Sequence, residues 1–190
     1  APDEAKHLIH RKLIGPPLGL LTLASTIEAD HDVKLLEMKG EYDLEPESTP
    51  PPAQLLRQWL AEFRPHLVGL TFIASEYPIG MELLREVKRF DPETTTVAGG
   101  LHAQLCPEHF DDEAVDVLSV SQAPQVFRVL VDALDGGHSL DAIGGLMIRG
   151  EAGLRRTKGQ ECQWDLAGED YIIPDRSLIH SSEVSISFSK

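Results

Sequence analysis

The residues that could do chemistry gather around a glycine pair, Gly99-Gly100, which Leu101 and His102 follow. A predicted strand, Thr94 to Ala98, ends at this pair, and an amphipathic segment comes next. Glycine has no Cβ, so backbone or ligand can approach it closely. In open α/β sheets, ligands bind beyond the carboxyl ends of the strands. The stretch therefore predicts either the floor of a site for a flat or extended ligand or a tight strand-to-helix turn. His102 would contact that ligand or form a hydrogen bond within its loop.

Other residue types argue against several kinds of chemistry. The two cysteines, Cys106 and Cys162, are far apart and show no metal or redox spacing, and the eight histidines include no pair at metal spacing on a helix. The sequence has no dinucleotide fingerprint, phosphate-binding lysine loop or nucleophile elbow. A net charge of −14 argues against a nucleic-acid partner. We expect a ligand-binding protein whose own side chains hold no metal.

Length and composition indicate one ordinary domain with an extension. The chain has 190 residues, of which 42% are hydrophobic, and no apolar run reaches the roughly 20 residues of a membrane helix. The start, residues 1–11, is polar and charged and shows no signal peptide. We therefore expect a cytoplasmic protein.

Apolar spacing predicts alternating strands and helices up to Gly137. Strands are expected at 33–38, 66–73, 94–98 and 115–120, and helices at about 18–30, 55–63, 83–90, 103–110 and 126–134. Residues 40–52 and 74–78 are predicted loops. This alternation is typical of right-handed βαβ units. It predicts an α/β fold with a doubly wound parallel sheet, Rossmann-like or flavodoxin-like.

The pattern changes after Gly137. Residues 146–157 predict a β-hairpin, and residues 158–190 predict an irregular tail. We place one domain at 1–140 and a hairpin with a connector at 141–190. No convincing strand precedes the first helix, so the first strand of the domain is either truncated or outside the numbered residues.

Several short motifs, taken in order, resemble one known family. These are Pro16-Pro17-Leu18-Gly19-Leu20 at the first helix, Val68-Gly69-Leu70-Thr71 in a strand, and Gly99-Gly100-Leu101-His102-Ala103 at the glycine pair. Together with the hairpin and the stretch Asp165–Leu178, they resemble the N-terminal cobalamin-binding domain of B12-dependent radical SAM enzymes. The resemblance covers about residues 13–178.

The resemblance implies a binding site for cobalamin, as methyl-, adenosyl- or hydroxocobalamin. The corrin would lie over the loops at Gly15–Leu18, Ser75–Tyr77 and Leu101–His102. The nucleotide tail would run between Thr71 and Gly99-Gly100, so Gly100→Leu should block the tail and spare the fold. The implied cofactor-binding residues are Gly15, Leu18, Thr71, Phe72, Ser75, Glu76, Tyr77, Gly99, Gly100, Leu101, His102, Ser121, Gln122 and Ala123.

Two departures from the wider family bear on this site. The Asp-x-His-x-x-Gly motif that supplies a lower axial histidine is absent, since His7 and His10 have the wrong spacing. We therefore expect cobalamin to bind base-off and histidine-off. The family's acidic turn is replaced by Val120–Pro124, where Ser121 and Gln122 could substitute for its polar contacts.

By this resemblance, the chain is the cofactor module of a radical SAM enzyme, most simply a methyltransferase, and is not catalytic alone. The parent enzyme would add SAM and a [4Fe–4S] cluster, which the two cysteines of this chain cannot hold. The hairpin and the connector would act as a lid or pack on the sheet edge, and a second copy of the chain could cover the cobalamin. Two alternatives stay open: a flavodoxin-like domain for flavin or signalling, and an interaction domain that binds no cobalamin.

Overall fold

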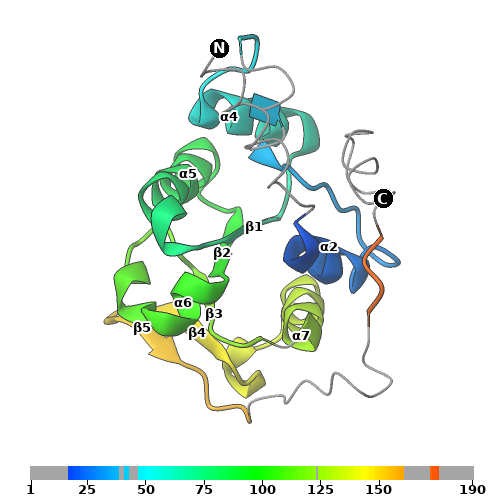
Figure 1. The fold of residues 1–190 in the computed structure, drawn as a ribbon. Coiled ribbons are helices and arrows are strands. Elements are labelled where there is room, and N and C mark those ends of the chain that lie inside the picture. Colours follow the sequence, from blue (N-terminus) through cyan, green and yellow to red (C-terminus); the bar gives the residue numbers. More distant parts are fainter. Residues whose placement is uncertain (1–16, 39–40, 43–46, 123, 161–171, 176–190) are drawn as a thin grey trace. The chain divides into compact units, whose positions relative to one another are not determined.

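The computed structural model describes residues 17–38, 41–42, 47–122, 124–160 and 172–175 (Figure 1). These residues belong to two compact units, which are described separately: Ala1–Thr49 with Ile172–Lys190, and Pro50–Tyr171. None of the helices in the described ranges has both the length and the apolarity needed to cross a bilayer. Most of the predicted connector, Asp165–Leu178, and most of the predicted tail lie outside the described residues.

The first unit contains the predicted first helix, α2 (Leu18–Ser25), which begins directly after Pro17. The helix is shorter than predicted, because a turn occupies residues 26–30. The predicted strand at 33–38 is wrong: residues 32–37 have no regular secondary structure. A short apolar run does not distinguish a strand from other buried segments, and a strand also needs a hydrogen-bonding partner.

The second unit carries the sheet and its helices. In chain order its elements are α4 (Pro52–Phe63), β1 (Leu67–Thr71), η1 (Ala74–Glu76), α5 (Tyr77–Phe90), β2 (Thr95–Gly99), α6 (Leu101–Leu105), η2 (Pro107–Phe110), β3 (Val117–Ser119), α7 (Pro124–Asp135), η3 (Leu140–Ala142), β4 (Leu146–Gly150) and β5 (Gly153–Arg156). The predicted helix at 103–110 is in fact two short helices, α6 and η2, which Cys106 separates.

The five strands form one mixed sheet in the order β1-β2-β3-β4-β5. β1, β2 and β3 are parallel, as predicted, with Leu67 opposite Thr95 and Val97 opposite Val117. The predicted hairpin, β4 and β5, extends this sheet because β4 pairs antiparallel with β3. The hairpin therefore packs on a sheet edge, and the fold is the Rossmann-like α/β architecture that the sequence predicts.

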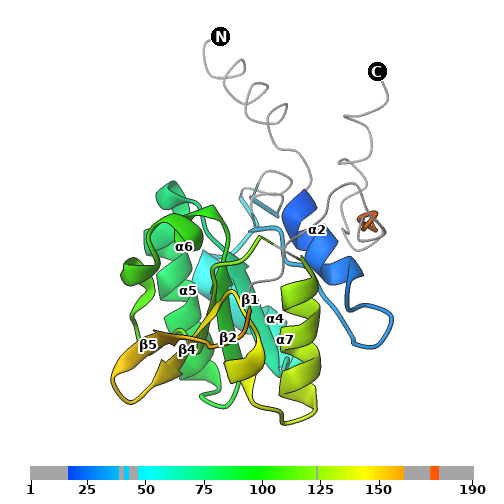
Figure 2. The same ribbon diagram turned by 90° about the horizontal axis from the view of Figure 1, so that it is seen from below.

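Alternating strand residues point to two separate cores. Ala98 and Leu118 face a core with α5 and α6, which includes Phe72 and Phe110. Their neighbours Val97 and Val117 face the opposite core, where α7 contributes Val126, Leu130 and Ala133. Figure 2 shows α7 on the other side of the sheet from α5 and α6. The period of two in each strand thus gives the sheet two covered faces.

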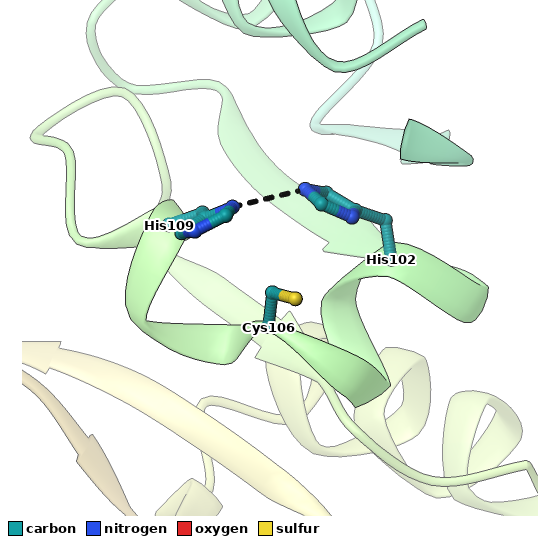
Figure 3. Close-up of side chains that lie close together, drawn as sticks. All are labelled: His102, Cys106 and His109. Atoms are coloured by element: carbon teal, nitrogen blue, oxygen red, sulfur yellow. Dashed lines mark hydrogen bonds between the residues drawn. The ribbon is translucent and has the colours of Figure 1, made fainter. Parts of the chain in front are cut away.

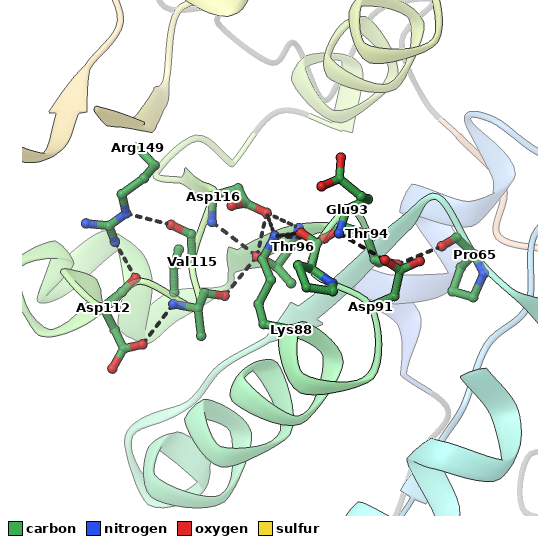
Figure 4. A network of polar contacts seen from close by, with 12 residues as sticks. Pro65, Lys88, Asp91, Glu93, Thr94, Thr96, Asp112, Val115, Asp116 and Arg149 are labelled. Atoms are coloured by element: carbon green, nitrogen blue, oxygen red, sulfur yellow. Dashed lines mark hydrogen bonds and ion pairs between the residues drawn. The ribbon is translucent and has the colours of Figure 1, made fainter. Parts of the chain in front are cut away.

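A polar network holds the amino ends of the strands (Figure 4). The fully buried Thr96 donates its hydroxyl to the carbonyl of Ala114, 2.8 Å away, and accepts the backbone N–H of Asp116 at 3.1 Å. The carboxylate of Asp116 accepts the backbone N–H of Thr96 and pairs with Lys88 at 2.6 Å. At the hairpin, a hydrogen bond from Arg149 holds the pKa of Asp111 below its usual value. These contacts fix the strand register from the end opposite to the predicted site.

Candidate functional site

The carboxyl ends of β1 and β2 are joined through backbone atoms alone. The N–H of Phe72 donates to the carbonyl of Gly99 at 2.9 Å, and the N–H of His102 donates to the carbonyl of Phe72 at 3.0 Å. Gly100 lies between these two bonds with a φ of +92°. This left-handed backbone turns the chain from β2 directly into α6, as the glycine pair predicts.

Gly100 is packed too closely for any side chain. A Cβ at this position would lie 2.5 Å from the hydroxyl of Thr71 and 2.7 Å from the backbone nitrogen of Phe72. The expectation that Gly100→Leu spares the fold is therefore wrong, because the substituted residue would collide with the backbone of the neighbouring strand. Gly100 is needed for the turn itself.

Gly99 has room where Gly100 has none. A Cβ on Gly99 would make only ordinary contact with Ser119, at 3.6 Å, and a Cβ on Gly69 would have nothing nearer than the carbonyl oxygen of Val97, at 4.0 Å. Thr71 lies opposite Gly99 in the register of β1 and β2. These four residues, Gly69, Thr71, Gly99 and Ser119, are hereafter the small-residue row.

The small-residue row lies on one face of the sheet. The register puts these residues on the same side of their strands as Val97 and Val117, so they lie on the face against which α7 packs. Gly69 and Thr71 are exposed, and Gly99 and Ser119 are partly exposed. The row is thus an exposed to partly exposed strip that runs from Gly69, in the middle of β1, to the carboxyl ends of the three parallel strands, where open α/β sheets bind ligands.

The other predicted site residues divide between this edge and the interior. Ser75 and Glu76 lie in η1, Tyr77 begins α5, and Leu101 and His102 begin α6. Leu101 is 57% exposed, whereas Phe72 is only 1% exposed and its ring packs edge-on against Phe110. Phe72 is therefore buried as a whole residue, and its backbone N–H and carbonyl are already bonded to Gly99 and His102.

The residues predicted after β3 are only partly described. Ser121 and Gln122 follow β3, and the amide of Gln122 donates to the side-chain oxygen of Gln104, 3.0 Å away. This bond ties the loop to α6 at the carboxyl edge. Gly15 and Ala123 lie outside the described residues, and Leu18 begins α2 in the other unit.

The sequence analysis missed one cluster at this edge: His102, Cys106 and His109. One ligand atom of each lies within 4.8 Å of those of the other two (Figure 3). His109 Nδ1 and His102 Nε2 are 3.2 Å apart. The signal in the sequence is the mixed spacing His-x₃-Cys-x₂-His, which contains neither a cysteine pair nor a histidine pair at metal spacing.

Comparison with known proteins identifies the family of this chain. The family model described as the B12 binding domain matches residues 7–131. An uncharacterised methyltransferase of Pyrococcus horikoshii is 30% identical over 143 residues, which is 74% of this chain. That stretch covers only 29% of the relative's own length.

Solved structures share the fold. The radical S-adenosylmethionine methyltransferase TsrM from Kitasatospora setae, with cobalamin and a [4Fe–4S] cluster bound, matches 76% of this chain and 28% of its own, with 19% identity and a TM-score of 0.62. The cobalamin-dependent S-adenosylmethionine radical enzyme OxsB, with aqua-cobalamin and S-adenosylmethionine bound, matches 80% of this chain and 21% of its own, with 17% identity and a TM-score of 0.64.

The geometry of the glycine pair gives a matched stability test. We predict that Gly100→Ala lowers the free energy of unfolding by about 1–2 kcal/mol for its left-handed φ, with about 1–3 kcal/mol more for the collision with Phe72. Gly99→Ala should change it by less than about 1 kcal/mol, because its Cβ meets only ordinary contacts. Urea unfolding of both variants measures the difference. Equal stability of the two variants would contradict the packing described for Gly100.

Proposed function

Because this chain belongs to the B12-binding domain family, whose ligand is cobalamin, we propose that it holds cobalamin at the carboxyl edge of β1, β2 and β3 as the cofactor module of a radical SAM methyltransferase. The observation that carries the proposal is the small-residue row. It leaves backbone exposed at the edge where open α/β sheets bind ligands. The nucleotide tail of cobalamin is a ligand of the extended kind that such a strip accommodates.

Each part of the edge has a role in this proposal. The tail lies along Gly69, Thr71 and Gly99, where the hydroxyl of Thr71 can hydrogen-bond to it. The corrin lies near η1 and the start of α6, where the exposed Leu101 offers apolar contact. Ser121 and Gln122 add polar groups beside the tail. Gly15, Leu18 and Ala123 stay predictions as contacts, as do the domain boundary at residue 140, the homodimer and the cytoplasmic location.

The methyltransferase role rests on the relatives. The chain spans less than a third of the length of the methyltransferase relative and of TsrM and OxsB, so the remaining parts of a homologous enzyme would carry the cluster and SAM. When bound, cobalamin supplies a cobalt centre that can carry a methyl group. This chain would supply the binding site and the orientation of the cofactor. Its two cysteines are one fewer than the radical SAM cluster motif needs.

We predict that Gly99→Leu weakens cobalamin binding at least about tenfold, or about 1.4 kcal/mol, because the leucine side chain fills the small-residue row. The matched control is Gly150→Leu. A Cβ on Gly150 meets only ordinary contacts, and β4 runs antiparallel to β3, so Gly150 lies toward the amino end of β3. Titration of the cobalamin absorption spectrum measures both affinities, with thermal unfolding as the check of folding. Unchanged affinity in a folded Gly99→Leu variant would contradict the proposed position of the tail.

We also predict that the bound cofactor has no nitrogen ligand below the cobalt. The axial-histidine motif is absent from the sequence, and Nε2 of His102 lies 3.2 Å from Nδ1 of His109. The EPR spectrum of the cobalt(II) form should therefore lack nitrogen superhyperfine splitting. Splitting that disappears in His102→Ala would show instead that this histidine binds the cobalt.

A further inference from the structure

We propose that His102, Cys106 and His109 form a binding site for Zn²⁺, with three protein ligands and a fourth position open to water. The site is separate from the proposed tail contacts of the small-residue row, whereas His102 is also one of the predicted corrin contacts. It lies beyond the carboxyl end of β2, where α6 meets η2.

The distances between the donor atoms suit a tetrahedral ion. With Zn–N bonds of about 2.0–2.1 Å, tetrahedral angles put two nitrogen ligands about 3.3 Å apart. His102 Nε2 and His109 Nδ1 are 3.2 Å apart. A Zn–S bond of about 2.3 Å puts the sulfur about 3.6 Å from each nitrogen. The Cys106 sulfur is within 4.8 Å of a ring nitrogen of each histidine, so each of these two distances would shorten by at most about 1.2 Å.

The backbone fixes the spacing of the three ligands. The N–H of Cys106 donates to the carbonyl of His102 at 2.9 Å, which puts these residues one helical turn apart on the same side. The N–H of His109 donates to the carbonyl of Cys106 at 3.1 Å, which closes the next turn. The hydroxyl of Tyr77 in turn donates to the carbonyl of His109 and anchors η2 to α5. Three ligands within eight residues are thus held by local hydrogen bonds.

Aromatic rings orient the two imidazoles. The ring of His102 lies 5.2 Å from that of Tyr77 and 5.6 Å from that of Phe110, measured between centroids. The ring centroid of Tyr77 also lies 5.8 Å from that of His109. Phe110 is fully buried in the core beneath α5 and α6. An apolar surround of this kind holds ligand side chains in place and lowers the local dielectric around a metal.

The donor set favours zinc over harder cations. One thiolate and two imidazoles are soft and borderline ligands, which suit Zn²⁺ and not Mg²⁺ or Ca²⁺. His109 is exposed, so an ion and a fourth ligand can reach the cluster from solvent. The cluster lies on the side of the sheet with α5 and α6, whereas the small-residue row lies on the side with α7. Zinc and the nucleotide tail could therefore be bound at the same time.

The test uses Co²⁺ as a spectroscopic probe of the zinc site in the full chain, prepared free of cobalamin. We expect one equivalent of Co²⁺ to give the intense visible bands of a tetrahedral ion together with a thiolate-to-cobalt charge-transfer band, and Zn²⁺ to displace it. Cys106→Ser should abolish the charge-transfer band. The matched control is Cys162→Ser, which removes the other cysteine of the chain and should keep the band.

A second variant covers the case in which Cys106→Ser does not fold. His109 is exposed, so its replacement should not disturb the core. Replacing a residue that only supports a metal ligand costs roughly 10–100-fold in metal affinity, and His109→Ala removes a ligand itself, so it should weaken Zn²⁺ binding by more than this. The control His66→Ala, at another exposed histidine, should leave Zn²⁺ affinity unchanged. The proposal is overturned if Co²⁺ gives no charge-transfer band, if the band survives in Cys106→Ser, or if it is lost in Cys162→Ser. Because the protein carries no cobalamin, a failure here leaves the proposed function untouched.

Discussion

The carboxyl edge of this sheet depends on one close backbone approach, at Gly100. Its Cα lies so near the end of β1 that a Cβ would come within 2.7 Å of the Phe72 nitrogen. This proximity allows the hydrogen bonds from Phe72 to Gly99 and from His102 to Phe72. It also starts α6 immediately after β2, which sets where His102 and Cys106 point. The turn thus determines both the exposed backbone at Gly99 and the position of the cluster of His102, Cys106 and His109.

Two different surfaces lie next to this turn, one on each face of the sheet. On the α7 face, small residues at three strand ends leave an uncovered strip, which suits the extended tail of a cofactor. On the face of α5 and α6, the aromatic rings of Phe72, Tyr77 and Phe110 pack around His102, directly or through one another. The first surface offers space and backbone atoms, and the second offers nitrogen and sulfur donors. The proposed cobalamin site would account for the first surface, and the proposed zinc site would account for the second.

The sequence predicted the features that depend on local pattern. The strands predicted at 66–73 and 94–98 and the helix predicted between them occur as β1, β2 and α5, and the glycine pair predicted the turn after β2. Predictions that need tertiary contacts were less reliable. The run 33–38 has the residues of a strand, but no pairing partner for it occurs among the described residues. The two glycines of the pair look equivalent in sequence, and the structure distinguishes them by the φ of +92° at Gly100 and by its close contacts with Thr71 and Phe72. The metal cluster was visible as His-x₃-Cys-x₂-His, but its meaning depends on Cys106 interrupting the helix so that His109 turns back toward His102.

A crystal structure of the chain with bound cobalamin would show whether the small-residue row holds the nucleotide tail. We expect electron density for the tail against Gly69, Thr71 and Gly99 on the α7 face, with no protein atom bound to the lower face of the cobalt. Density for the tail on the face of α5 and α6, or a bond from His102 to the cobalt, would contradict it.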